Sequence, residues 1–240
     1  MKVALAPALG GDDLVIGRLN ELLAAGIEPP PVLQHLLGRP GPRLITAAAQ
    51  LCGKSRHEAA NIAVKRHYRG KLGPNPPHPP AAVAARFAGA AWDDYTKFCF
   101  VRNPYERVAS DYFWRRRSTG KTFGFKDFLQ ALARGHESGG ILHKGIVSNW
   151  DMMTIDGKMI VDRVGRYETL HEDFHQIVEQ LGLGGLSLKS AEKRGSSHAS
   201  YGELYGPEER ALVAEIFRPE LEHFGYEFPY GGPRAAGVAL

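Results

Sequence analysis

An arginine ends a short apolar run in the segment "KFCFVRNPYERVASDYFW", residues 97–114. Its first five residues are typical of a buried strand, and Asn103 and Pro104 are typical of the cap and first residue of a helix. Beyond the carboxyl end of a strand, a helix N-terminus offers N–H groups and positive dipole charge to an anion. Arg102, together with Ser110 two helical turns later, is therefore a candidate phosphate-binding pair.

The same two residues also have a purely structural interpretation. Arg102 would pair with Glu106, and Ser110 would be a serine on the helix surface.

The charge distribution favours an anionic ligand. The formal net charge is only +4, but residues 54–71 carry six basic residues against one acid, and residues 102–121 carry six against two. Two local basic patches of this kind are typical of proteins that bind anions.

The apolar pattern predicts strands that alternate with helices. Strands are expected at 44–51 and 97–101, and helices at 12–25, 58–67, 80–91, from 104, 170–181 and from 207. Residues 71–80 are too rich in proline to be anything but an irregular connection. Alternation of this kind predicts a three-layer α/β sandwich, with a central, mostly parallel sheet flanked by helices.

Three local signals follow in the second half of the chain. Asp156-Gly157 between two apolar runs predicts a hairpin. Thr169, with Glu172 three residues later, predicts a capping box at the start of a helix. Arg166 and Glu168 are expected to form an ion pair that steadies the turn before that helix.

Composition predicts one globular domain over residues 1–240, with an accessory segment at 1–42 and a flexible tail at 229–240. No apolar stretch is long enough to span a bilayer, and residues 1–11 lack a basic segment followed by a long apolar one. Two cysteines are too few for a disulfide framework. We therefore expect a soluble protein of the reducing cytoplasm that makes no contact with a membrane.

Residues 100–112 resemble the 3′-phosphate motif "FVRNPxxRxxSxY" of the carbohydrate-type sulfotransferases. Further blocks resemble the same family in the same order: "WDDYTK" at 92–97, "VDRVGRYETLHEDF" at 161–174 and "ELEHFGYEF" at 220–228. These enzymes take a sulfuryl group from 3′-phosphoadenosine 5′-phosphosulfate (PAPS). The resemblance implies a P-loop-like sandwich in which Arg102 and Ser110 bind the 3′-phosphate of this nucleotide, after a divergent N-terminal segment.

The family holds the 5′-phosphosulfate on a strand followed by a loop similar to "PKTGGTS". The segment in the matching place is "LCGKSRHEAANI", where Lys54 takes the position of the lysine and Ser55 that of the first hydroxyl. His57 and Glu58 stand where glycine and threonine are expected, and an acid disfavours a bound sulfate. Lys54 and Ser55 are thus candidate donor-binding residues, and a basic surface loop is the alternative.

The segment "GGILHKGIVSNWDMM" resembles the "HFRPQSxW" region of the family and puts His143 at its histidine. A neutral imidazole suits the removal of a proton from an acceptor hydroxyl, so His143 is the candidate general base, with His57 and Glu58 as rivals. The segment "AEKRGSSHASYGELYGPEE" resembles a loop that folds over the nucleotide. In it, Arg194 or Ser196 would contact a phosphate, unless the loop is merely basic and exposed.

The predicted function is transfer of a sulfuryl group from PAPS to a hydroxyl of a carbohydrate or small metabolite. The rate of such a reaction depends mainly on positioning of the reactants and on fixed positive charge. Lys54 would polarise the sulfuryl group, and the reaction requires no metal. One alternative is a P-loop phosphotransferase using "GKS" at 53–55, although Ala48 occupies the place of its earlier glycine. Another is a non-catalytic nucleotide or nucleic-acid binding protein. The aromatic residues near the basic patches have helix-core spacing, which disfavours nucleic acid.

Overall fold

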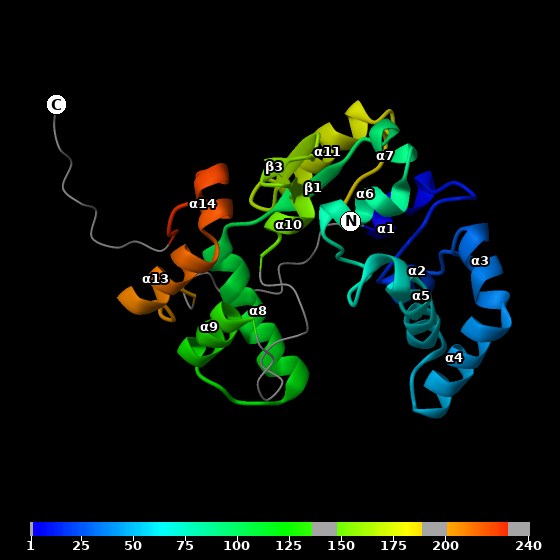
Figure 1. Cartoon of the computed structure of the whole chain (residues 1–240), viewed down its shortest axis with the longest axis horizontal. Coiled ribbons are helices and arrows are strands. Elements are labelled where there is room, and N and C mark those ends of the chain that lie inside the picture. Colours follow the sequence, from blue (N-terminus) through cyan, green and yellow to red (C-terminus); the bar gives the residue numbers. More distant parts are fainter. Residues whose placement is uncertain (1, 136–147, 189–200, 230–240) are drawn as a thin grey trace. The chain divides into compact units, whose positions relative to one another are not determined.

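The computed structural model describes residues 2–135, 148–188 and 201–229 and mixes helices with short strands (Figure 1). The chain divides into two compact units. Unit 1 comprises Met1–Cys99, Met152–Gly165 and Thr169–Ser190, and unit 2 comprises Phe100–Asp151, Arg166–Glu168 and Ala191–Leu240. The domain expected over 1–240, with its accessory segment and tail, stays a prediction.

Unit 1 is largely helical. Its helices are α1 (Lys2–Leu5), η1 (Ala6–Ala8), α2 (Leu19–Ala24), α3 (Pro31–Gly38), α4 (Pro40–Leu51), α5 (Arg56–Leu72), α6 (Ala81–Ala88), α7 (Ala91–Asp94) and α11 (Leu170–Gln180). Helix α5, which extends the expected helix over 58–67 at both ends, packs against α2, α3, α4 and α6. Its residues 60, 64, 68 and 72 are buried at four-residue spacing, so one stripe of α5 faces the apolar core of this unit.

The strand predicted over 44–51 is wrong, because this segment lies inside helix α4. A proline opens the first turn of the helix, where a missing N–H costs nothing, and the alanines at 47–49 are the best helix formers. Leu44 and Leu51 are 71% and 91% exposed. The apolar run therefore marks neither a strand nor a buried element.

The helix predicted over 12–25 is much shorter in the structure and begins only at Leu19. Gly17 and Arg18 both have positive φ, which breaks the helical path before that point. Asp13, near the start of the expected helix, accepts a hydrogen bond from the backbone N–H of Gly10. The backbone N–H of Leu19 donates to the Asn61 side chain on α5, which holds the start of α2 in place.

Two small sheets are present in the described residues. Strands β1 (Phe98–Val101) and β4 (Arg163–Arg166) form one sheet, and β2 (Thr154–Ile155) pairs antiparallel with β3 (Lys158–Met159) in the other. The second sheet confirms the predicted hairpin, with positive φ at both Asp156 and Gly157.

The pairing of β1 with β4 is parallel. Asp162 and Arg163 donate their backbone N–H groups to the carbonyl of Lys97, and Tyr167 donates to that of Val101, so both segments run in the same direction. A mixed α/β chain with a small parallel sheet is thus confirmed. A three-layer, P-loop-like sandwich is not confirmed, because the described residues form only two-stranded sheets and the expected strand at 44–51 is helical.

Unit 2 is built around an aromatic core. Its helices are α8 (Pro104–Thr119), α9 (Phe125–Arg134), α13 (Pro207–Ile216) and α14 (Arg218–Phe224), and the short α10 (Trp150–Met153) begins in it. Phe128 and Phe217 are fully buried in this core, and the hydroxyl of Tyr205 donates to the carbonyl of Tyr105 at 2.6 Å. The predicted helix starts at 104 and 207 are confirmed.

The capping box predicted at Thr169 is wrong. Helix α11 begins where expected, but the side chain of Thr169 makes no capping hydrogen bond and its hydroxyl donates to Asp173 instead. The predicted apolar face of α11 is confirmed, since Phe174, Ile177 and Val178 are buried. Within the described ranges, no helix combines the length and the apolar content needed to cross a membrane.

Candidate functional site

The turn from β1 to α8 positions Arg102. Asn103 caps the helix, because its side-chain oxygen accepts a hydrogen bond from the backbone N–H of Tyr105 at 3.0 Å. The Asn103 backbone N–H donates to Glu168 Oε1 at 2.8 Å, and its side-chain amide donates to the carbonyl of Glu227, also at 2.8 Å. Three hydrogen bonds thus fix the residue that follows Arg102.

Arg102 itself contacts a carboxylate and an aromatic ring. Its Nε and Nη2 atoms both lie 3.4 Å from Glu106 Oε2, and its side chain is 18% exposed. The guanidinium carbon lies 4.5 Å from the centre of the Tyr167 ring, a distance typical of a cation–π contact. The ion pair of the structural interpretation is therefore formed, although 3.4 Å is longer than a good hydrogen bond.

Ser110 lies one turn beyond Glu106 on α8, so the two side chains share a face of the helix. Ser110 is half-buried, and the Glu106 side chain is 14% exposed. The carboxylate of Glu106 thus lies between the two predicted phosphate-binding residues, Arg102 and Ser110, in the sequence. An anion at this site has to compete with Glu106 for Arg102.

Three positions at the helix N-terminus, residues 103–105, offer an anion no free backbone N–H group. The N–H of Asn103 is used by Glu168, the N–H of Tyr105 is used by the Asn103 side chain, and Pro104 has none. An anion at this turn would therefore rely on the side chains of Arg102 and Ser110 in place of these three backbone positions.

Glu168 and Arg166 hold the end of α14 and the segment that follows it. Glu168 Oε2 accepts a hydrogen bond from the Tyr226 hydroxyl at 3.0 Å. Arg166 donates to the carbonyl of Phe224 at 2.8 Å, and its guanidinium lies 4.9 Å from the centre of the Tyr226 ring. Burial, and then the charge of Glu168, raise the pKa of Tyr226. These contacts join residues about 60 positions apart, and sequence reasoning missed them.

A buried carboxylate, Glu220, pairs with the other arginine of the motif, Arg107. Glu220 Oε1 lies 3.3 Å from Arg107 Nη2, and it accepts hydrogen bonds from the Ser148 hydroxyl at 2.6 Å and the Asn149 backbone N–H at 3.0 Å. The Glu220 side chain is 3% exposed. Burial lowers the pKa of Arg107, and Glu220 opposes that shift. Arg107 therefore ties α8 to α14, and Ser148 ties the segment before α10 to α14, so both residues have a structural role.

The candidate phosphosulfate loop follows helix α4 rather than a strand. Ser55 is the N-cap of α5: its hydroxyl accepts a hydrogen bond from the Glu58 N–H at 3.2 Å, and its own N–H donates to Glu58 Oε2 at 3.0 Å. The Ser55 N–H and then its hydroxyl hold the pKa of Glu58 below its ordinary value. The pattern S-x-x-E, visible in the sequence as Ser55 to Glu58, already signals this capping box.

The predicted site residues fall into three groups. Arg102 and Ser110 belong to unit 2, whereas Lys54, Ser55 and the rival bases His57 and Glu58 belong to unit 1. His143, Arg194 and Ser196 lie outside the described residues. In the part of the chain that the structure describes, no group of three or more His, Cys, Asp or Glu side chains could hold a metal ion.

Comparison with known proteins decides the family. A sequence model described as the sulfotransferase family matches residues 83–227, well over half of the chain. The chain belongs to the sulfotransferase family. The matched region contains Arg102 and Ser110, together with their neighbours Tyr167 and Glu168, and it does not include Lys54 or Ser55.

A protein of Archaeoglobus fulgidus, described as an uncharacterized protein, is 28% identical to this sulfotransferase over 112 residues. The alignment covers 42% of this chain and 79% of the archaeal protein. No solved structure gives a significant match. Family membership supports sulfuryl transfer in general, to a small-molecule acceptor.

Proposed function

We propose that this sulfotransferase takes its sulfuryl group from PAPS and transfers it to a hydroxyl of a carbohydrate or another small metabolite. The observation that carries the proposal is the environment of Arg102. Its guanidinium stands at the end of β1, lies against the Tyr167 ring and precedes the helix face that carries Ser110. In this proposal, Arg102 and Ser110 hold the 3′-phosphate that distinguishes PAPS from common adenine nucleotides.

Binding of the 3′-phosphate involves an exchange of partners at Arg102. The guanidinium gives up two contacts of 3.4 Å to one oxygen of Glu106 and gains phosphate oxygens at hydrogen-bonding distance. The guanidinium carbon lies over the Tyr167 ring, and this contact with the ring uses none of the guanidinium N–H groups, which can therefore bind the phosphate. The exchange therefore needs no rearrangement of the turn itself, which is fixed through Asn103.

In the reaction, the acceptor oxygen forms a bond to sulfur while the bond from sulfur to the donor's phosphate oxygen breaks. The electron pair of that bond leaves on 3′-phosphoadenosine 5′-phosphate, and the hydroxyl proton passes to a base. Charge grows on the bridging and equatorial oxygens, so fixed cations stabilise the transition state. Lys54 is the candidate cation at the sulfuryl group, and Arg194 and Ser196 are candidates for further phosphate contacts.

The candidate bases differ in their suitability. Glu58 is held by Ser55 with a lowered pKa, which makes it a weak proton acceptor. His57 is half-buried on the first turn of α5, and His143 remains the first candidate because of its place in the family motif. Ser55 would have to leave its capping box before it could contact the donor.

The test is a calorimetric titration with 3′-phosphoadenosine 5′-phosphate, with AMP and ATP as control ligands. Arg102→Ala should weaken binding of the bisphosphate by about 10- to 100-fold, because a charge-assisted hydrogen bond is worth about 1.5–3 kcal/mol. Arg117→Ala, which removes an exposed arginine from the last turn of the same helix, should bind as wild type. If Arg102→Ala retains the wild-type affinity, the assignment of Arg102 to the 3′-phosphate is wrong.

The capping box at Ser55 favours a second candidate, a protein that binds the nucleotide without transferring the sulfuryl group. Two observations disfavour the phosphotransferase alternative. Helix α4, and not a strand, precedes "GKS", and Ser55, the serine of this segment, is hydrogen-bonded to Glu58. Formation of bisphosphate from PAPS in the presence of hydroxylated acceptors separates the candidates. Binding without turnover would favour the second one.

A further inference from the structure

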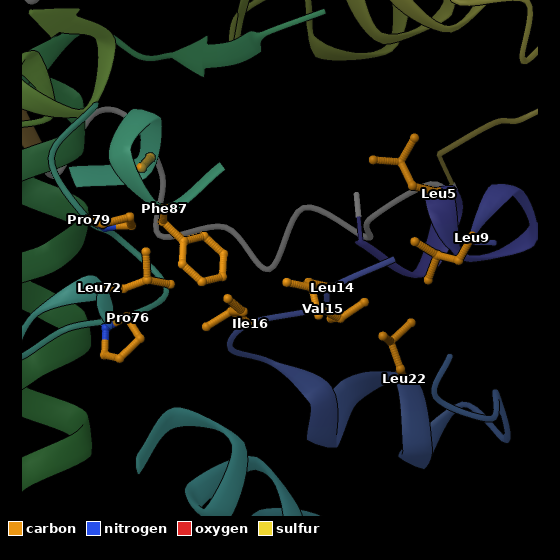
Figure 2. A pocket seen from close by; sticks show the side chains of 11 residues that line it. Leu5, Leu9, Leu14, Val15, Ile16, Leu22, Leu72, Pro76, Pro79 and Phe87 are labelled. Carbon is orange, nitrogen blue, oxygen red and sulfur yellow. The ribbon is translucent and has the colours of Figure 1, made fainter. Parts of the chain in front are cut away.

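An apolar cavity of about 380 Å³ lies in unit 1 (Figure 2). Its eleven lining side chains are all hydrocarbon, and they come from the first 22 residues and from residues 72–87. Figure 2 shows Leu72, Pro76 and Phe87 on one side and Leu14 and Ile16 next to them. Ligand-binding pockets typically enclose about 300–1,000 Å³ and are mostly apolar, so this cavity has the size and lining of such a site.

The walls of the cavity are held in place by the fold. Leu22 and Leu72 are 1% and 3% exposed and belong to the core of unit 1. Gly17, next to Ile16, packs so closely on Pro77 that an added Cβ would lie 2.6 Å from the proline ring. Leu14 is 38% exposed, which places it at the mouth. The cavity is therefore preformed and open on one side.

Positive charge lies beside the cavity. The ammonium group of Lys71 is 6.0 Å from the centre of the Phe87 ring. Lys71 and Arg39 both act on His67: burial, then the charge of Lys71, then that of Arg39, lower its pKa. The single acid of the basic stretch 54–71 is Glu58, 13 residues from Lys71 and so about 20 Å away along α5. Asp13, beside Leu14, is engaged by the Gly10 N–H.

We propose that this cavity binds the hydrocarbon part of an anionic amphiphile, with the carboxylate or sulfate ester of the ligand near Lys71. A cavity of about 150 Å³ accommodates benzene, so 380 Å³ corresponds to roughly ten to fifteen carbons. The proposal accounts for the basic stretch at the end of α5, which the sulfotransferase site does not use. It does not depend on PAPS as the donor.

The first test is a calorimetric titration of the full chain with hexanoate, octanoate and decanoate below micelle formation. Affinity should rise about threefold to fourfold for each added methylene group, as expected for burial of a hydrocarbon chain. Lys71→Gln should weaken octanoate binding about tenfold and leave 1-octanol binding unchanged. Arg66→Gln, a matched change five residues earlier on α5, points away from Lys71 on the helix and should have no effect.

A second test fills the cavity. Ala84→Phe places a ring in it and should weaken decanoate binding at least tenfold, whereas Ala85→Phe on the same helix does not line the cavity and serves as the control. If Ala84→Phe does not fold, Leu14→Trp at the mouth replaces it with the same expectation. Affinity that is independent of chain length, or equal in the two Phe variants, overturns the proposal.

Three other occupants would also overturn it. Dimerisation that Ala84→Phe abolishes, without any binding of decanoate, would assign the apolar surface to a second copy of the chain. If only a chain lacking residues 230–240 bound decanoate, that segment would be the natural occupant. Binding to anionic vesicles, but not to monomeric decanoate, would assign the surface to a bilayer.

Discussion

Tyr167 orients the guanidinium that is proposed to hold the 3′-phosphate, and its removal gives a graded test. Tyr167→Leu removes the ring that lies 4.5 Å from the Arg102 guanidinium, whereas Tyr167→Phe keeps it. In both variants, the backbone N–H of residue 167 still donates to the Val101 carbonyl at 2.8 Å, so the β1–β4 pairing is retained.

The expected magnitude follows from the exposure of the ring. Tyr167 is 50% exposed, and a cation–π contact at an exposed site is worth about 0.5–1 kcal/mol. Tyr167→Leu should therefore weaken binding of 3′-phosphoadenosine 5′-phosphate about twofold to fivefold. Tyr167→Phe should bind as wild type, because the hydroxyl plays no part in the contact.

The assay is the same calorimetric titration, with Tyr95→Leu as a control for the loss of an exposed tyrosine elsewhere, since Tyr95 is 60% exposed in unit 1. The double variant with Arg102→Ala should show no additional loss, because the tyrosine acts only through the arginine. Equal losses in the Leu and Phe variants would refute the cation–π explanation. A Leu variant with wild-type affinity would show that the ring does not orient Arg102.

Two further predictions concern stability. Removal of the buried carboxylate in Glu220→Gln leaves the charge of Arg107 uncompensated and should lower the free energy of unfolding by about 3 kcal/mol in urea denaturation, whereas Glu222→Gln, an exposed change on the same helix, should lower it very little. Tyr226 has a raised pKa in the folded chain, so it stabilises the fold fully below its unfolded pKa of about 10, and this contribution is lost as the pH rises above that value. The difference in stability between wild type and Tyr226→Phe should therefore shrink between pH 9 and 11, and a constant difference over that range would contradict the role assigned to burial and Glu168.

Local signals gave correct predictions where neighbouring residues decide the outcome. The Asn103 cap, the helix start at Pro104 and the Asp156-Gly157 turn depend on residues within one turn of each other, and all three are present. The segment 44–51 failed because a short apolar run fits either a strand or a helix. Its leading proline and its alanines settle the matter in favour of α4, and the exposure of Leu44 and Leu51 shows that apolar residues need not be buried.

The candidate site was only partly predictable for a different reason. The pair of Arg102 with Glu106 is four residues apart and could be foreseen, as the structural alternative shows. Tyr167 and Glu168 reach the same turn only because β4 pairs with β1, and Glu227 only because of the path of the chain after α14. Such contacts depend on tertiary structure, which the spacing of residues in one segment does not encode.

The contacts around Arg102 also clarify what family membership supports. The turn is held by Glu168 and Glu227, and the guanidinium lies against Tyr167, all within the matched residues 83–227. Family membership and the proposed 3′-phosphate contact therefore draw on the same small region, whereas Lys54 and Ser55 lie outside it and in a helix-capping loop. The Arg102 turn can thus hold the nucleotide as proposed even if another part of the chain binds the sulfuryl group. The proposed 3′-phosphate contact at Arg102 and the proposed sulfuryl contact at Lys54 and Ser55 can therefore be tested independently of each other.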